Sequence, residues 1–171
     1  MTQEEYKSLK ELLLKDLCAR LPYGVIGKCE IDASYDTPFE TKLQTHKFDA
    51  EVYGILEEGL LFVTPLIEDQ DVQELANEEV SNGIDILDFK PYLFPLSSMT
   101  EEQKEELKQE HIKDEKLYVK CLTMTSKGDN SMRGKVIIHY AMDWCNKNHF
   151  DYRGLIEKGL AIDATELNIY C

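Results

Sequence analysis

Hydrophobic residues follow a helical period at the start of the chain. Apolar side chains recur every three or four residues, at Tyr6, Leu9, Leu13, Leu17 and Leu21. Thr2 and Glu5 form a capping-box pair that begins a helix, and Pro22 disfavours helical backbone at the residue before it. The pattern predicts an N-terminal helix that ends near Arg20.

From residue 24 onwards apolar positions alternate with a period of two, which is typical of strands. We predict four strands, at residues 24–31, 48–56, 60–64 and 84–89, and a loop at residues 34–38. The second and third strands flank Glu57-Glu58-Gly59, which favours a hairpin turn. Residues 68–83 carry six acidic side chains and no basic one. We predict a short helix there, with an acidic loop as the alternative.

Two prolines hold residues 90–95, KPYLFP, in an extended conformation. Three further elements are predicted after it: a helix from the Ser98–Glu101 and Thr100–Gln103 capping boxes to Ile112, a strand or helix at residues 117–124 and a polar loop at residues 125–134.

The single Trp lies in a helical pattern at residues 135–148. We expect a buried face formed by Ile137, Ile138, Tyr140, Ala141, Trp144 and Cys145. We expect the water-facing side to hold His139, Asp143, Asn146 and Lys147. Asp151 can cap a shorter second helix, and Gly159 suits the left-handed position that ends it.

These elements predict an α+β fold with an N-terminal helix, a small antiparallel β-meander or barrel-like sheet and a C-terminal helical part. We divide the chain into residues 1–98, an acidic helix plus a strand-rich part, and residues 99–171, a mainly helical part. A chain of 171 residues is long enough for the two parts to pack as one globular unit.

Negative charge is concentrated in the first half of the chain. Residues 1–99 carry 8 basic and 20 acidic side chains, whereas residues 100–171 carry 11 and 13. Because phosphate groups would be repelled, we expect no direct nucleic-acid binding. The acidic surface favours solubility, and mimicry of nucleic acid is the alternative.

The sequence contains no apolar run that could span a bilayer and no targeting peptide pattern. Five cysteines without a CxxC pair indicate free thiols in a reducing compartment. We therefore expect a cytoplasmic protein that does not associate with a membrane.

No catalytic or metal-binding constellation is complete. The GK pair at residues 134–135 lacks the glycine and the hydroxyl side chain of a phosphate-binding loop. His139 and Asp143 have no nucleophile placed beside them, and Cys145 with His149 supplies two zinc ligands where three or four are needed. We expect no catalytic residue, no metal site and no cofactor.

The turn after the Trp-bearing helix is the best candidate for a binding site. Its side chains that can hydrogen-bond, stack or pair with charge are those of His149, Asp151, Tyr152 and Arg153. The alternative is structural, with Asp151 as a cap, Arg153 paired with an acid and His149 packed in a core. Residues 90–95 are a second candidate, because an extended aromatic and proline-rich segment can be a docking surface.

Three blocks of sequence, ARLPYGV at 19–25, KPYLFPLSSMTEE at 90–102 and DWCNKNHFDYRGLIEKGLA at 143–161, resemble an uncharacterised protein family of gut Bacteroidales and of their phages and prophages. No activity is assigned to that family, so the resemblance implies a setting and no mechanism. Phe94 stands where the family has an arginine, and residues 163–171 lack the family's proline-containing end.

We therefore expect a small non-catalytic accessory protein of a phage or mobile element that acts through contacts with a protein partner. A small-ligand-binding protein or enzyme that uses the turn from His149 to Arg153 is the alternative. A self-assembling structural protein is a third hypothesis. The sequence does not identify the partner, the oligomeric state or the strand order.

Overall fold

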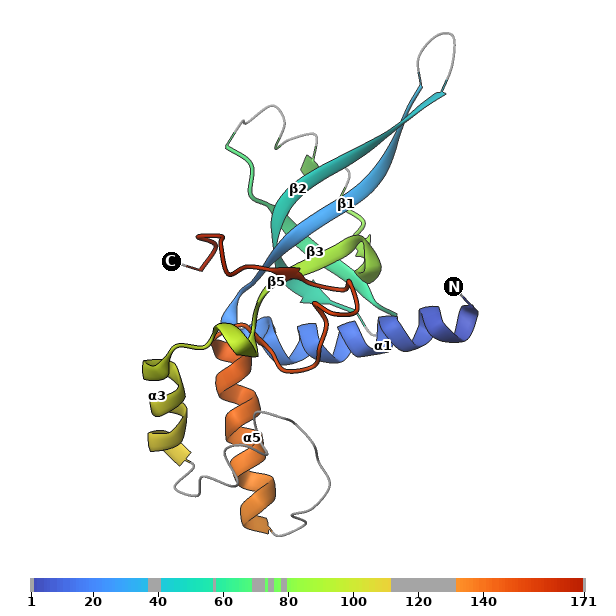
Figure 1. Cartoon of the computed structure of the whole chain (residues 1–171). Coiled ribbons are helices and arrows are strands. Elements are labelled where there is room, and N and C mark those ends of the chain that lie inside the picture. The colour runs from blue at the N-terminus through green and yellow to red at the C-terminus, as the bar shows by residue number, and fades with distance from the viewer. Residues whose placement is uncertain are drawn as a thin grey trace. The chain divides into compact units, whose positions relative to one another are not determined.

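The computed structural model describes residues 2–36, 41–56, 58–68, 73, 76–77, 80–111 and 132–170. For residues 32–36, 41–44, 108–111 and 132–137 it describes the backbone alone. The predicted α+β class is confirmed: an N-terminal helix is followed by a curled mixed sheet that forms half of a barrel, and then by a C-terminal helix (Figure 1).

The chain divides into two compact units. Unit 1 comprises Met1–Tyr92 and Leu160–Ile162, and unit 2 comprises Leu93–Gly159 and Asp163–Cys171. The chain passes from the first to the second within strand β5 (Phe89–Pro95). That residues 1–98 and 99–171 pack as one globular body stays a prediction.

Helix α1 (Gln3–Arg20) begins and ends where the sequence predicts. The Thr2 hydroxyl accepts from the Glu5 N–H at 3.2 Å, and the Glu5 carboxylate accepts from the Thr2 N–H at 2.7 Å. The helix is followed by the 3-10 turn η1 (Leu21–Tyr23), which contains Pro22. Leu13 and Leu17 are fully buried, whereas Tyr6, which belongs to the same helical period, is exposed.

The strands of unit 1 form an antiparallel sheet in the order β4-β3-β2-β1-β5. Its members besides β5 are β1 (Val25–Asp36), β2 (Thr41–Ile55), β3 (Leu60–Pro65) and β4 (Ile84–Asp85). The predicted hairpin between β2 and β3 is confirmed, and Gly59 has a φ of +77° in its turn.

Several predicted boundaries in this sheet are wrong, since β1 and β2 are longer than the strands expected at residues 24–31 and 48–56. The expected loop at residues 34–38 is strand as far as Asp36, because β1 and β2 pair without interruption from Val25↔Val52 to Asp36↔Thr41. The strand expected at residues 84–89 is divided by the 3-10 turn η2 (Ile86–Asp88), where the Asp85 carboxylate accepts from the Leu87 N–H at 3.0 Å. In the expected helix at 68–83, the described residues 73, 76, 77 and 80 are helical. Residue 68 is a bend, residues 81–83 follow the helical positions as a turn, and the rest of the segment lies outside the described ranges.

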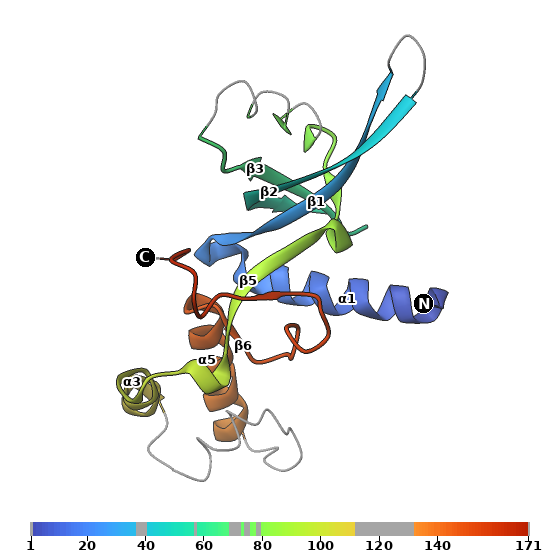
Figure 2. The same cartoon turned by 45° about the horizontal axis from the view of Figure 1, so that its top comes forward.

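One face of the sheet carries the core of unit 1, and α1 lies along it in both views of the ribbon (Figures 1 and 2). Alternation along the strands buries Val25, Cys29, Phe48, Ala50, Val52, Leu61 and Val63. Each Val, Leu or Phe side chain among them stabilises the fold by roughly 1.5–3 kcal/mol where burial is complete. An ion pair of 2.6 Å between Lys10 and Asp85 joins α1 to the end of β4.

A buried ion pair that the sequence did not predict lies at the C-terminal end of α1. Asp16 and Arg20 are both fully buried, and their side chains form two hydrogen bonds, Nε to Oδ2 at 2.7 Å and Nη2 to Oδ1 at 3.1 Å. The i,i+4 spacing on one helix brings the two groups together. The two hydrogen bonds of this bidentate contact offset the free-energy cost of removing both charged groups from water.

Unit 2 contains α3 (Glu101–His111), α5 (Met132–Lys147) and the short strand β6 (Phe150–Asp151), which pairs in parallel with the end of β5. Strand β7 (Ile162–Asp163) also pairs with β5. The core of unit 2 consists of Met99, Leu107, Ala141, Trp144, Cys145, Phe150 and Tyr152, so Ala141, Trp144 and Cys145 of the expected buried face of α5 belong to it. The rings of Trp144 and Phe150 stack with centroids 5.6 Å apart.

The capping box of Thr100 with Gln103 is confirmed, with bonds of 2.9 and 3.2 Å. The box of Ser98 with Glu101 is wrong, because Ser98 lies in the 3-10 turn η3 (Leu96–Ser98) and donates its hydroxyl to the Pro95 carbonyl.

Three expectations about the C-terminal part are wrong. Tyr140 is exposed and Asn146 is buried, which reverses their predicted places on α5. The second helix after Asp151 is a series of turns, although Gly159 has the expected left-handed φ of +70°. The last three residues of the expected loop at 125–134 are helical, and residues 117–124 lie outside the described ranges.

Gly27 should be the least replaceable position of the sheet. A Cβ atom there would lie 2.5 Å from the Lys90 carbonyl and 2.5 Å from the Phe89 ring, so β5 would have to move away from β1. We expect Gly27→Ala to lower the free energy of unfolding by about 2 kcal/mol in urea denaturation. Gly54→Ala is the matched control, because its Cβ would meet Phe62 at an ordinary 3.5 Å. Equal stability of the two variants would contradict this assignment.

Removing one member of the buried ion pair should cost more than removing both. Arg20→Met leaves the Asp16 carboxylate buried without its bidentate partner, and we expect a loss of about 3–5 kcal/mol in the free energy of unfolding. The double variant Asp16→Leu/Arg20→Met buries no charge at these positions and should lose clearly less. Urea denaturation of the three proteins measures the difference, and a double variant less stable than Arg20→Met would refute it.

Candidate functional site

The predicted turn lies in unit 2, directly after α5. The His149 N–H donates to the Asn146 carbonyl at 3.2 Å, and the Asn148 side chain donates to the Trp144 carbonyl at 2.9 Å. His149 has a φ of +56°, a left-handed conformation that is uncommon for a residue other than glycine. This residue redirects the chain from α5 into β6.

The imidazole of His149 is packed against an aromatic ring from the end of the chain. Its ring is buried and stacks on Tyr170, with centroids 3.6 Å apart and planes inclined by 7°. The backbone is fixed too, since the Phe94 N–H of β5 donates to the His149 carbonyl at 2.9 Å. Sequence spacing could not reveal this stack, because Tyr170 comes close only through the fold.

Asp151 organises the turn with its carboxylate. The carboxylate is buried and accepts hydrogen bonds from the N–H groups of Arg153 at 3.3 Å, Leu155 at 2.9 Å and Ile156 at 2.8 Å. The predicted capping role is therefore correct, although the capped segment is a chain of turns rather than a helix. Three backbone donors to one anionic group account for a rigid loop.

Tyr152 and Arg153 contact each other. Tyr152 is a buried member of the aromatic core, and the guanidinium carbon of Arg153 lies 4.7 Å from the centre of its ring. Such a cation–π contact stabilises by about 0.5–1 kcal/mol at a partly exposed position. Of the four predicted residues, Arg153 alone is more than slightly exposed. These contacts serve the fold, and ligand binding by the four residues stays a prediction.

The weaker constellations are also placed by the structure. The GK pair at residues 134–135 is inside α5, not in a loop, and His139 and Asp143 are exposed on that helix. Cys145 is a buried thiol. In the part of the chain that the structure describes, no three His, Cys, Asp or Glu side chains are grouped to hold a metal ion.

A cluster that the sequence did not predict lies on the outer face of the unit 1 sheet, opposite the core. Lys28 on β1 faces Asp49 on β2, and their Nζ and Oδ1 atoms are 2.6 Å apart. The Tyr92 hydroxyl, from β5, donates to the same Oδ1 at 2.7 Å. Three strands therefore meet at one carboxylate oxygen.

The electrostatics of this cluster oppose a catalytic role. Burial by itself would raise the pKa of Asp49, but hydrogen bonds from Lys28 and Tyr92 outweigh it and lower the pKa. The hydrogen bond to Asp49 raises the pKa of Lys28, and burial followed by that same carboxylate raises the pKa of Tyr92. All three shifts move the pKa away from neutrality, whereas a general base requires a pKa near it.

Cys29, on the opposite face of β1, is equally unsuited to nucleophilic chemistry. Burial, followed by the nearby carboxylates of Asp49 and Asp88, raises the pKa of its thiol to about 12. The thiol is fully buried in the core of unit 1. Because the thiolate is the reactive form, this cysteine remains an inert core residue.

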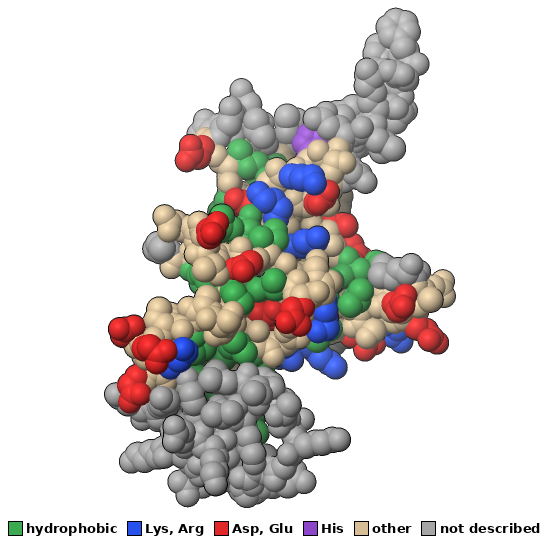
Figure 3. All heavy atoms as spheres, viewed as in Figure 1, with side chains coloured by type: hydrophobic (Ala, Val, Ile, Leu, Met, Phe, Trp, Pro, Cys, Tyr) green, Lys and Arg blue, Asp and Glu red, His purple; other side chains and the backbone are tan. Residues whose placement is uncertain are grey.

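Acidic and basic side chains are interspersed on the face shown in space-filling view (Figure 3). A second ion pair of 2.6 Å, between Lys47 and Glu30, lies next to the pair of Lys28 with Asp49 on the β1–β2 ladder. Nucleic-acid mimicry would require a run of unpaired carboxylates spaced like phosphates. On the β1–β2 ladder, Asp49 and Glu30 are instead each paired with a lysine, whereas Glu51 on β2 is exposed.

The outer side of the β2–β3 hairpin carries exposed apolar side chains. We call it the hairpin patch and define it by the exposed Tyr53 (65%), Leu56 (49%) and Leu66 (45%) together with the half-buried Phe62. A shift in register between Val52 and Gly54 marks a bulge that places Tyr53 over Phe62, with ring centroids 6.2 Å apart. The run LLFVTPL at residues 60–66 is apolar at successive positions, and this signal could have revealed a strand apolar on both faces.

Acidic conditions should weaken the outer-face cluster. A carboxyl group whose pKa is lowered by folding adds stability above its unfolded pKa, and this stability is lost as the pH falls through the folded pKa. We expect Asp49→Asn to cost about 0.5–1 kcal/mol in free energy of unfolding at pH 7, a value that allows for partial exposure. The difference from the unsubstituted protein should shrink below about pH 4. Urea denaturation at both pH values measures it, and a constant difference would contradict the assignment.

Within the described ranges, none of the helices combines the length and the apolar character that a bilayer crossing would need. Comparison of the chain with models of protein families, with curated proteins and with solved structures found no match.

Proposed function

We propose that this chain is a non-catalytic accessory protein of a phage or mobile element, and that it binds a protein partner through the hairpin patch. The observation that carries the proposal is the exposure of Tyr53, Leu56 and Leu66 on the outer side of one hairpin. Single exposed hydrophobic residues are ordinary, whereas a contiguous apolar patch with a polar rim is typical of interaction sites. Tyrosine is also among the residues that contribute most to binding energy at protein interfaces.

The rim of the patch indicates the chemistry of the partner. Glu51, Glu58 and Glu68 are exposed on or beside the two strands, and the chain has a formal net charge of −14. A partner surface with an apolar centre and basic side chains around it would complement this arrangement. The apolar contact would supply the affinity, and the charges would mainly set orientation and association rate.

The biological setting rests on sequence blocks and not on the patch. The blocks at residues 19–25, 90–102 and 143–161 resemble proteins of gut Bacteroidales and of their phages.

The test is recovery of a partner from a Bacteroidales lysate by the immobilised full chain. Tyr53→Ser/Leu66→Ser removes two members of the patch. Tyr140→Ser/Leu167→Ser is the matched control, because it removes the same residue types at comparable exposure from unit 2. We expect the partner with the unsubstituted chain and the control, and at least about tenfold less with the patch variant.

Binding of the recovered partner should also slow as salt concentration rises, because complementary charges accelerate association. Equal recovery by both double variants would show that binding is elsewhere. Failure of the unsubstituted chain to retain any protein, or loss of recovery in the control alone, would overturn the proposal.

A further inference from the structure

Strands β1 and β2 continue well beyond the strands that flank them. Strand β5 pairs with β1 only at Gly27, Lys28 and Cys29, and β3 pairs with β2 only over residues 50–55. Residues 30–36 and 41–47 pair with each other alone among the described strands, and we call them the arm. Both ribbon views show the arm projecting past the ends of β3 and β5 (Figures 1 and 2).

An arm of two strands has two edges. A lone pair of strands is marginally stable in water, since it lacks the neighbours that bury a sheet. Each edge presents backbone N–H and C=O groups that could pair with a further strand. The arm is therefore a place in unit 1 where, among the described strands, strand addition is geometrically open.

The ladder determines which residues direct their backbone groups outward. The Leu66 N–H donates to the Asp49 carbonyl at 2.7 Å, so Asp49 faces the β3 side of β2. Because antiparallel strands alternate, Phe48 and its partner Cys29 face each other across the β1–β2 ladder. It follows that the outward-facing residues of β1 in the arm are Glu30, Asp32, Ser34 and Asp36.

The opposite edge follows the same rule with different residues. On β2 the outward-facing positions are Lys47, Thr45, Leu43 and Thr41. Three of the four outward-facing positions of the β1 edge are acidic (Glu30, Asp32 and Asp36), with Glu30 paired to Lys47 across the ladder, whereas the β2 edge has no acidic residue. The two edges of the arm differ in charge although their backbones are equivalent.

The difference in charge between the two edges indicates which kind of strand could pair with the β1 edge. A second copy of the chain that paired β1 edge with β1 edge would place acidic residues opposite acidic residues, which is destabilising. An extended segment of another protein with Lys or Arg at every second position would instead place opposite charges across the new ladder. Main-chain hydrogen bonds would supply affinity, and the alternating charges would supply specificity.

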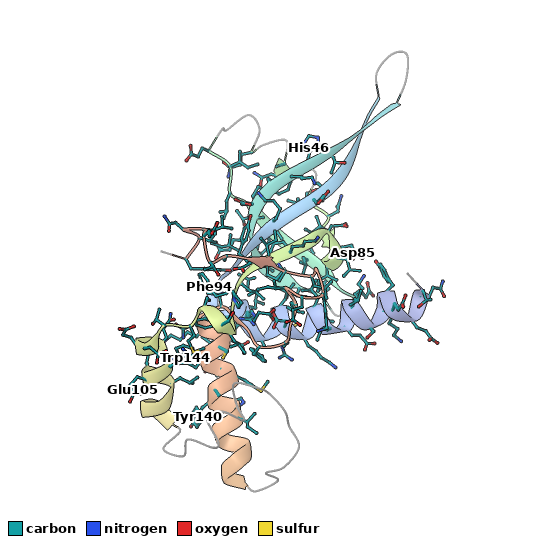
Figure 4. The ribbon with its side chains drawn as sticks, viewed as in Figure 1. His46, Asp85, Phe94, Glu105, Tyr140 and Trp144 are labelled. Carbon is teal, nitrogen blue, oxygen red and sulfur yellow. The ribbon has the colours of Figure 1, made fainter. Side chains whose placement is uncertain are left out.

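We propose that the β1 edge of the arm, residues 30–36, takes up a basic extended segment of a partner protein by strand addition. This surface is separate from the hairpin patch, and either could be correct without the other. His46 lies on β2 within the arm and marks its position in the side-chain view (Figure 4).

The first test uses the full chain with a synthetic peptide of about nine residues that alternates Lys and Val, long enough to cover the edge. Backbone amide signals of Glu30, Asp32, Ser34 and Asp36 should shift and become protected from hydrogen exchange. A peptide with Glu in place of Lys should bind at least about tenfold more weakly. The Lys peptide with N-methyl groups on alternate peptide bonds keeps its charge but loses donors, and it should not protect these amides.

The second test uses two proline variants of the chain. Ser34→Pro removes an outward donor from the β1 edge, and Thr45→Pro removes one from the β2 edge, so both perturb the arm to a similar degree. We expect loss of peptide binding in Ser34→Pro alone. Asp32→Lys/Asp36→Lys should reverse the preference and bind the Glu peptide.

Several outcomes would overturn the proposal. Equal binding of the N-methylated peptide would show attraction by charge alone, and protection of the β2 edge would place the segment on the wrong side. Equal loss in both proline variants, or no protection with any peptide, would also overturn it. Tyr53→Ser/Leu66→Ser should leave peptide binding unchanged. This variant therefore distinguishes strand addition at the β1 edge from partner binding through the hairpin patch.

Discussion

The structure depends on the close approach of β5 to β1 at Gly27. The space that a Cβ atom would need is occupied by the Lys90 carbonyl and the Phe89 ring, so only glycine allows the pairing at this distance. The pairing fixes where β5 begins, and the same strand then continues into unit 2, where Phe94 pairs with Phe150. The approach also brings Tyr92 to the outer face, where it completes the cluster with Lys28 and Asp49.

Unit 1 has an ion pair buried in its core and further ion pairs on the outer face of its sheet. Asp16 and Arg20 are fully buried, and their bidentate contact is what makes two charges tolerable in the core. On the outer face, Lys28 and Lys47 each pair with a carboxylate across the β1–β2 ladder, so the middle of the sheet is close to neutral. Exposed acidic residues remain beside the β2–β3 hairpin, at Glu51, Glu58 and Glu68.

The proposed role follows from what each region offers a partner. The turn from His149 to Arg153 uses its side chains internally: His149 stacks on Tyr170, and Asp151 accepts three backbone hydrogen bonds. The outer side of unit 1 offers an apolar patch and an open strand edge, both of which suit contact with another protein better than chemistry on a small molecule. Recognition would then combine apolar contact with backbone pairing, and acidic residues accompany both.

Local pattern by itself determined the helix α1 with its capping box, the β2–β3 hairpin, the capping role of Asp151 and the burial of Trp144, because each depends on residues close in sequence or on one amphipathic period. Only the tertiary structure decided that Asn146 is buried and Tyr140 exposed. The hydrophobic period of a helix does not show which elements pack against each of its faces. The tertiary structure also decided that Lys28, Asp49 and Tyr92 meet, and that Tyr170 covers His149. Strand order and register bring these residues together from distant parts of the chain, and neither leaves a local signal in the sequence.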